Sequence, residues 1–135
     1  MAVAQRRRLS QTPAMPIAMP PAIVCERPWV SDGDTLSCRN LPARVRLMGI
    51  DAPEMPGHCN VGRRCTPGNG GASKRALIGL VRSGPVIVKP QGYDRYDRIL
   101  ARVSVNGVDL SCKMVASGAA VYRYTRIVCP RRKAW

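Results

Sequence analysis

The sequence contains no phenylalanine, one histidine and only eight carboxylate side chains among its 135 residues. Without phenylalanine, a folded core must be built mainly from Val, Ile, Leu and Met, so the four Tyr and two Trp become notable. A single histidine argues against a zinc centre, because such centres take their ligands from several His and Cys side chains. No apolar run is long enough for a transmembrane helix, which needs about eighteen or more residues, so a membrane span is excluded.

Positive charge is in large excess. The chain has 22 Lys and Arg against 8 Asp and Glu, for a formal net charge of +14. Most of the basic residues are Arg, whose planar guanidinium can bind two phosphate oxygens at once. This balance favours DNA or RNA as the partner, although an anionic membrane surface would satisfy the charge alone.

Six cysteines in a small basic chain predict disulfide bonds and an oxidising compartment, hence a secreted or periplasmic protein. The first expected bridge would cross a hairpin centred between Ser31 and Asp32, where facing strands bring two cysteines within bonding range. The second would restrain a loop rich in Gly and Pro, and the third joins the two cysteines that remain. Sequence alone does not choose among the alternative pairings. The three expected bridges are Cys25–Cys38, Cys59–Cys65 and Cys112–Cys129.

The chain divides into a leader and one domain. Residues 1–21 mix Arg, Pro, Gln and Met without periodicity, which is typical of an extended or disordered leader. A degenerate signal or a pro-segment is an alternative, since prolines interrupt the apolar stretch that a signal peptide requires. Residues 22–135 are long enough for one domain with its own core.

The hydrophobic pattern of this domain predicts mainly strands. The spacing of apolar residues predicts two helices, the second capped by Asp109, and Asn106-Gly107 predicts a sharp turn. Five strands with helices after the third and the fifth fit an α+β, mainly β fold, a small OB-type barrel. The expected strands are 22–27, 34–39, 43–50, 86–89 and 99–105, the helices are 72–82 and 110–117, and 121–124 is a short extended piece.

Residues 32–54 hold four of the eight carboxylates, although the rest of the chain is strongly basic. Asp-Gly predicts a turn, which would place Asp34 at the start of a strand, and Pro53 would restrain the loop that carries Asp51 and Glu54. Two carboxylates and a backbone carbonyl form an oxygen-only ligand set that suits Ca²⁺. Taken alone, the first of these motifs is more often a plain hairpin turn.

Three separated motifs resemble those of the staphylococcal-nuclease-like thermonucleases. They are D-G-D-T at 32–35, R-L-M-G-I-D-A-P-E at 46–54 and Y-D-R at 96–98, within a resemblance that covers about residues 23–124. The resemblance implies the OB-type fold and a Ca²⁺-dependent, sugar-nonspecific hydrolysis of DNA or RNA phosphodiester bonds that leaves 3′-phosphate ends. It also places individual residues in roles.

The roles implied by the resemblance fall into four groups. A general base would take a proton from the attacking water, and guanidinium groups would stabilise charge on the phosphate oxygens. Carboxylate and carbonyl oxygens would hold Ca²⁺, supported by a neighbouring acid, and further side chains would bind substrate phosphate or stack on bases. The general base would be Glu54, and the guanidinium groups would be those of Arg46 and Arg98. The Ca²⁺ ligands would be Asp34, Asp51 and the Ala52 carbonyl, with Asp32 as the supporting acid. The substrate-binding side chains would be Arg95, Tyr96, Tyr122 and Tyr124.

The chain departs from the family pattern at two positions. Ala52 stands where the best-known member has Thr, a change of little weight if only the carbonyl binds the metal. Asp97 stands where Gly is usual before the second arginine, and it would need a backbone geometry that Asp tolerates only in part. Its charge could also pair with Arg98, and either effect could reduce the activity.

Other interpretations of the same residues remain open. Each acid or arginine alone could be an ordinary surface charge, and the tyrosines could be packing residues. The alternative function is a non-catalytic nucleic-acid-binding OB-type module, which needs a basic face but has no need for the metal carboxylates and Glu54. No obligate protein partner is evident, and we expect a monomer.

Overall fold

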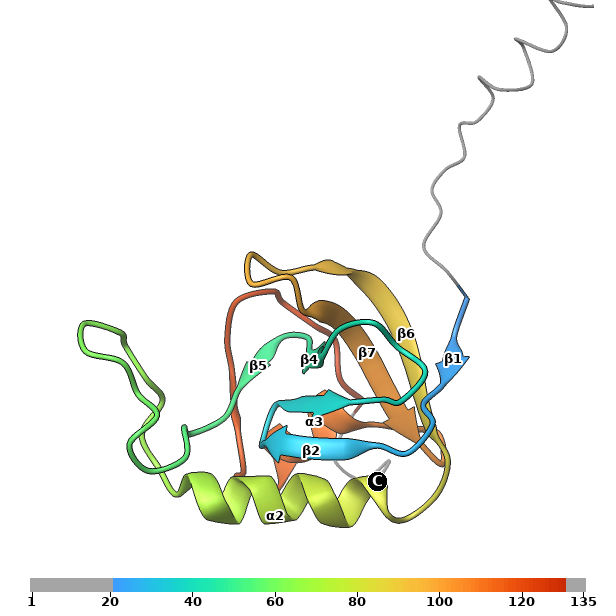
Figure 1. Ribbon diagram of the computed structural model, residues 1–135. Helices are drawn as coiled ribbons and strands as arrows, with labels where there is room; N and C mark the ends of the chain where they lie inside the picture. The colour runs from blue at the N-terminus through green and yellow to red at the C-terminus, as the bar shows by residue number, and fades with distance from the viewer. Residues whose placement is uncertain (1–20, 131–135) are drawn as a thin grey trace, which may run out of the picture.

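The structure is a computed structural model that describes residues 21–130 (Figure 1). The expected leader, apart from Pro21, and residues 131–135 of the expected domain lie outside this described part. The boundary between leader and domain therefore stays a prediction.

Short strands dominate the described chain. Their bounds are β1 (Ile23–Val24), β2 (Trp29–Asp32), β3 (Thr35–Ser37), β4 (Val45–Leu47), β5 (Ile50–Asp51), β6 (Val86–Tyr93), β7 (Ile99–Val105), β8 (Val108–Asp109) and β9 (Val121–Tyr122). The helices are α2 (Gly70–Val81) and α3 (Leu110–Ala116).

The main sheet has the strand order β1-β6-β7-β4-β3-β2, with β8 added beside β7, and β5 pairs separately with β9. All pairings are antiparallel except β4 with β7. The sheet curls into a half-barrel, and α2 runs alongside β2 (Figure 1). The predicted fold class, a mainly β, OB-type arrangement with two helices in the described residues, is confirmed.

The first hairpin differs from its prediction. The expected strand 22–27 is only β1, and a separate strand, β2, pairs with β3 around a turn at Gly33 and Asp34. Asp34 therefore ends the turn, one residue before the strand that it was expected to begin. The shift follows from Val30, which pairs with Leu36 and is buried with it in the core.

Two other strand boundaries were also wrong. The expected strand 43–50 is interrupted at Met48 and Gly49, where Gly49 adopts a positive φ of 83° that few other residues tolerate. The expected strand 86–89 continues as β6 to Tyr93, through Pro90. Proline is accommodated there because β1 pairs only with Ile87 and Val88, and a bulge follows Pro90 on the β7 side.

Both helices form as predicted, with small differences at their ends. Helix α2 starts two residues early because the Asn69 side chain caps it, accepting a hydrogen bond from the Ala72 amide at 2.9 Å. Asp109 caps α3 in the same way through the Cys112 amide at 2.9 Å, as expected. The predicted Asn106-Gly107 turn joins β7 to β8, and both residues have positive φ values.

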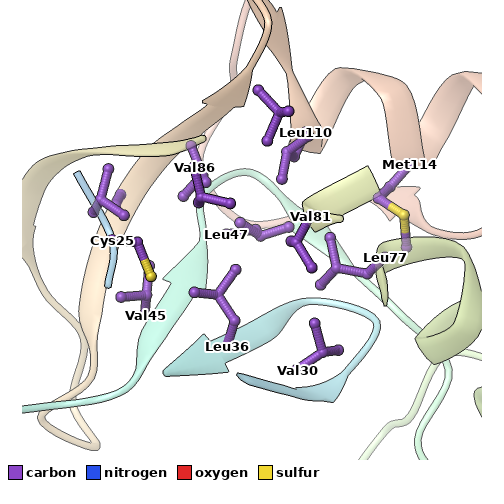
Figure 2. Close-up of a cluster of buried hydrophobic side chains, with 14 of the residues drawn as sticks. Cys25, Val30, Leu36, Val45, Leu47, Leu77, Val81, Val86, Leu110 and Met114 are labelled. Atoms are coloured by element: carbon purple, nitrogen blue, oxygen red, sulfur yellow. The ribbon is translucent and has the colours of Figure 1, made fainter. Parts of the chain in front are cut away.

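The core is aliphatic, as the lack of phenylalanine predicts. Figure 2 shows Leu77 and Val81 of α2 beside Leu36 and Leu47 from the sheet, and all four are buried. Burial of aliphatic side chains from both layers is the main source of stability in such a fold. Every aromatic side chain in the described residues is at least partly exposed, so none of the tyrosines is a core residue.

All three predicted disulfides are present, namely Cys25–Cys38, Cys59–Cys65 and Cys112–Cys129. The first does not cross the β2–β3 hairpin as expected. It joins the segment after β1 to the residue that follows β3, because the hairpin is centred at Gly33 and does not include Cys25. The Cys25 amide instead donates a hydrogen bond to the Val86 carbonyl of β6. Among residues 21–130, no helix is long and apolar enough to cross a membrane.

Candidate functional site

The turn between β2 and β3 carries Asp34, whose side chain is buried. The Asp34 amide donates to Asp32 Oδ1 at 3.2 Å, so Asp32 shapes the turn, and its supporting role at a cation stays a prediction. Gly33 is needed there because a Cβ atom would collide with Ser73 of α2 and Ala52. The turn is thus pressed against a helix and the D-A-P-E segment.

Asp34 is buried and held by three neighbours. Its Oδ1 accepts from the Thr35 hydroxyl at 2.8 Å, its Oδ2 accepts from the Ala52 amide at 2.9 Å, and Arg46 lies 3.4 Å away. Burial raises the pKa of Asp34 to about 6, which outweighs the lowering effect of Arg46. The neighbouring Asp32 carboxylate raises this pKa further.

Arg46 of β4 is buried and joins the acids. Its Nη1 donates to the carbonyls of Leu47 and Ile50, each at 2.9 Å. Its Nη2 donates to Asp51 Oδ1 at 3.1 Å and lies 3.4 Å from Asp34 Oδ2. Two carboxylates separated by 17 residues in sequence therefore meet at one guanidinium nitrogen.

Asp51, at the end of β5, is almost fully buried and has further donors on its second oxygen. Thr66 Oγ1 donates to Asp51 Oδ2 at 2.6 Å, and Arg123 Nη1 donates to the same atom at 3.1 Å. These contacts bring the loop before α2 and the segment after β9 onto one carboxylate. Neither Thr66 nor Arg123 was identified from the sequence.

Glu54 follows Pro53 at the start of the long loop that leads to α2. Its side chain is 18% exposed, and Arg63 Nη2 lies 3.4 Å from Glu54 Oε2. The backbone of Glu54 packs so closely against Gly70, the first residue of α2, that a Cβ atom there would overlap the Glu54 carbonyl. The helix end therefore helps to fix the position of Glu54.

Arg98 is held by Asp94 in the β6–β7 turn. Arg98 Nε donates to Asp94 Oδ2 at 2.7 Å, and the Arg98 and Tyr96 amides donate to Asp94 Oδ1 at 2.9 and 2.8 Å. Burial acts to raise the pKa of Asp94, but these hydrogen bonds and the Arg98 charge outweigh it and hold the pKa below its usual range.

Asp97 has the unusual backbone geometry expected at this position, with a φ of 62°. The pairing of Asp97 with Arg98 that the sequence suggested is wrong, because the arginine bonds Asp94 instead. Asp97 adopts a positive φ, a region that glycine enters at little cost, and Arg98 pairs with Asp94 instead. This departure from the family pattern thus keeps the turn intact.

A cavity of about 610 Å³ lies beside these residues and is strongly cationic. Six arginines line it, with one acid, Asp94, and two tyrosines. Guanidinium groups converging on a concave surface are suited to bind phosphate oxygens. The arginines are Arg46, Arg63, Arg64, Arg95, Arg98 and Arg123, and the tyrosines are Tyr96 and Tyr124.

The two tyrosines of the cavity are exposed and contact the arginines. Arg95 and Arg98 lie 5.1 and 5.3 Å from the centroid of the Tyr96 ring. Arg46 and Arg123 lie 5.8 and 5.0 Å from that of Tyr124. An exposed ring beside cations can stack on a nucleic-acid base.

Tyr122, by contrast, lies on β9 opposite Ile50, and it is not among the cavity-lining residues in the described chain. Its ring is nonetheless exposed, so contact with substrate outside the cavity stays a prediction.

The carboxylates fit a hard divalent cation by their chemistry. Asp34 and Asp51 approach each other at Arg46, the Ala52 backbone adjoins both, and all available ligand atoms are oxygens. Within residues 21–130, no group of three or more His, Cys, Asp or Glu side chains is arranged for a metal ion. The donor set is therefore limited to two carboxylates and a carbonyl, and water would have to complete it.

The sequence did contain signals for the residues that were missed. Arg63 and Arg64 lie between two cysteines, so a local bridge fixes their loop, and Arg123 lies between two tyrosines already assigned to substrate. Thr66 offered no signal, because a lone hydroxyl after a cysteine is common in loops.

Comparisons with known proteins identify the family of this chain. A family described as "Staphylococcal nuclease homologue" matches residues 44–134, which includes Arg46, Asp51, Glu54 and Arg98. A protein of Haemophilus influenzae described as an "Uncharacterized endonuclease" is 36% identical over 99 residues. That match covers 71% of this chain but only 50% of the relative, so the chain spans about half of that protein's length. Sequence match, fold and clustered acids and arginines together show that the chain belongs to the family of staphylococcal nuclease homologues.

Proposed function

We propose that the protein is a Ca²⁺-dependent, sugar-nonspecific nuclease that hydrolyses DNA or RNA phosphodiester bonds and leaves 3′-phosphate ends. The observation that carries the proposal is the meeting of Asp34 and Asp51 at Arg46 Nη2, 3.4 and 3.1 Å away, beside a cavity lined by five further arginines. A binding surface alone would need the arginines but not two buried acids.

The cation would be held by Asp34, Asp51 and the Ala52 carbonyl, where it would supply positive charge next to the phosphate. Arg46 holds both carboxylates in place and reaches the cavity wall. Arg98, held by Asp94 through Nε, lines the same cavity, where its remaining guanidinium nitrogens would bind phosphate oxygens. Preorganised donors of this kind are worth about 3 kcal/mol each in other sites that stabilise oxyanions.

Glu54 is the proposed general base. It takes a proton from the attacking water as the new P–O bond forms, and the bond to the 5′ oxygen breaks. The departing oxygen takes up a proton from solvent water and leaves as a 5′-hydroxyl, so the phosphate stays on the 3′ side. Arg95, Tyr96, Tyr122 and Tyr124 would bind the flanking phosphates and bases.

The three disulfides support action in a secreted or periplasmic setting, because such bonds persist in oxidising compartments. Action as a monomer remains a prediction. The alternative function, a non-catalytic nucleic-acid-binding module, draws its support from the ion pair between Glu54 and Arg63, which could make the acid a structural partner.

The proposal is tested by cleavage of single-stranded DNA by Glu54→Gln and Arg98→Ala. Both variants should lose cleavage by roughly a hundredfold or more, in keeping with removal of a general base or an oxyanion donor. The matched controls are Glu26→Gln, an exposed acid paired with Arg39, and Arg102→Ala, an arginine paired with Asp109 outside the cavity. Equal loss in test and control variants would count against the assigned roles.

A further inference from the structure

The loop between β5 and α2 reaches away from the sheet (Figure 1), yet two of its side chains contact acids of the site. The Cys59–Cys65 disulfide closes a short ring within it, and this ring contains Arg63 and Arg64. Thr66 follows the ring directly. The proposed reaction and its cation already account for Asp51 and Glu54, but not for the loop residues that contact them.

Arg63 contacts the proposed base. Its Nη2 lies 3.4 Å from Glu54 Oε2, and the Arg63 side chain also lines the cationic cavity. Glu54 is only 18% exposed, so this ion pair limits the directions that its carboxylate takes. Arg64 lines the same cavity without an ion pair to Glu54 in the described structure.

Thr66 contacts the proposed cation ligand. Its hydroxyl donates to Asp51 Oδ2 at 2.6 Å, and the Asp51 side chain is only 2% exposed. Because Oδ2 is held by Thr66 and Arg123, the other oxygen, Oδ1, is the one that faces Arg46. A hydroxyl in the loop thereby helps Arg123 to fix the rotation of a buried carboxylate.

We propose that this disulfide-closed loop carries two positioning residues, Arg63 for Glu54 and Thr66 for Asp51, and that the Cys59–Cys65 bridge keeps both in place. The inference rests on the proposed nuclease function. It adds that activity depends on the redox state of one disulfide, because opening the ring frees the segment that orients both acids.

The test of Thr66 uses Thr66→Val, which removes the hydroxyl while keeping the shape, and Thr66→Ser, which keeps it. We expect Thr66→Val to bind Ca²⁺ roughly ten- to a hundredfold more weakly by titration calorimetry, as for other residues that orient metal ligands. Thr66→Ser should restore the affinity. Unchanged Ca²⁺ affinity in Thr66→Val would overturn the role of this residue.

The test of Arg63 separates kcat from KM. Arg63→Gln should lower kcat more than it raises KM, and Arg63→Lys should restore part of kcat. The matched variant Arg64→Gln, beside it in the same ring, should chiefly raise KM. The same kinetic change in Arg63→Gln and Arg64→Gln would overturn a positioning role.

The test of the bridge compares two double variants, Cys59→Ala with Cys65→Ala and Cys25→Ala with Cys38→Ala, below the Tm of each. The first should lose most of its kcat, while the second should keep kcat and lose thermal stability. Full kcat without the Cys59–Cys65 bridge would overturn the inference alone. Absence of cleavage by the unaltered protein would overturn the proposed function and this inference together.

Discussion

Arg46 is the residue on which the two acids of the site depend. Four contacts hold its buried guanidinium, two to carbonyls of its own turn and two to carboxylates from separate segments. Removing such a group leaves the buried Asp34 without the arginine that pairs with it, although Asp51 keeps its ion pair with Arg123. An uncompensated buried charge is costly. Arg46 is therefore a structural residue as well as a proposed catalytic one.

We expect Arg46→Ala to lower the free energy of unfolding by about 3 kcal/mol, the usual cost of breaking a buried ion pair. Arg46→Lys should also destabilise, because one ammonium group cannot satisfy two carbonyls and two carboxylates. Urea unfolding checks both variants against Arg44→Ala, an exposed neighbour. If the Arg46 variants lowered the free energy of unfolding no more than Arg44→Ala does, the structural role of Arg46 would be contradicted.

Asp94 makes the stability of the protein depend on pH. Its pKa is lowered in the folded protein, so near pH 3 to 4 the folded state binds fewer protons than the unfolded state, whose Asp pKa is about 3.9. The stabilisation is present above about pH 4 and is lost as the pH falls through the lower, folded value. Asp94→Asn removes it.

The measurement is the unfolding free energy of the wild type and Asp94→Asn between about pH 2 and 7. The difference between the two proteins should be largest near neutral pH and should shrink below about pH 4. A difference that does not change with pH would show that the carboxylate charge contributes nothing.

At the scale of elements, helix α2 and the loop before it position the proposed base. Gly70 at the start of the helix lies against the Glu54 backbone, where a Cβ atom would overlap backbone rather than a flexible side chain. Gly79, in the same helix, has open space where a Cβ would be placed. The two glycines offer a matched comparison.

Gly70→Ala should push the Glu54 backbone away from its position and lower kcat at least tenfold, with a loss of stability. Gly79→Ala should raise stability by about 1 kcal/mol and leave kcat unchanged, because alanine is the better helix former. Thermal unfolding and DNA cleavage check both. Equal kcat in the two variants would contradict a role for this packing in catalysis.

Most elements were predictable where local pattern and capping agree. Strand β7 and the Asp109 cap of α3 were predicted at the positions where they form. The β2–β3 hairpin was misplaced because its register depends on which side chains reach the core, and burial of Val30 opposite Leu36 is a tertiary effect. Gly49 interrupts an apparent strand for a backbone reason that an alternating pattern does not reveal.

At the scale of the whole molecule, the net charge of +14 should dominate association with nucleic acid. Affinity for single-stranded DNA should fall steeply with salt, because bound arginines displace counterions from the strand. With the cavity arginines making about five phosphate contacts, the slope of log K against log salt should be about −3 to −4. Arg64→Gln should make this slope less steep by about 0.7, and DNA affinities measured by fluorescence anisotropy at several salt concentrations can detect the change.

The same slope in Arg64→Gln and the wild type would show that this part of the cavity does not meet phosphate. The control is Arg102→Ala, whose arginine is paired with Asp109 outside the cavity and should leave the slope unchanged.

The candidate site was predictable in part. The motifs identified Asp34, Arg46 and Asp51 from their types and spacing, and the structure brings these three together. The contacts of Thr66 and Arg123 with Asp51 join segments 15 and 72 residues away, which no local pattern encodes. The partner of Arg98 was predicted wrongly because Asp97 is adjacent in sequence, whereas the turn brings Asp94 to the guanidinium.

The most direct test of the proposed function is cleavage of labelled single-stranded DNA by the unaltered protein with Ca²⁺ and with a chelator, while DNA binding is followed in parallel. We expect cleavage to 3′-phosphate ends with Ca²⁺, and DNA binding without cleavage when the chelator removes the ion. Salt-sensitive binding without cleavage under both conditions would contradict the nuclease function and favour the nucleic-acid-binding module.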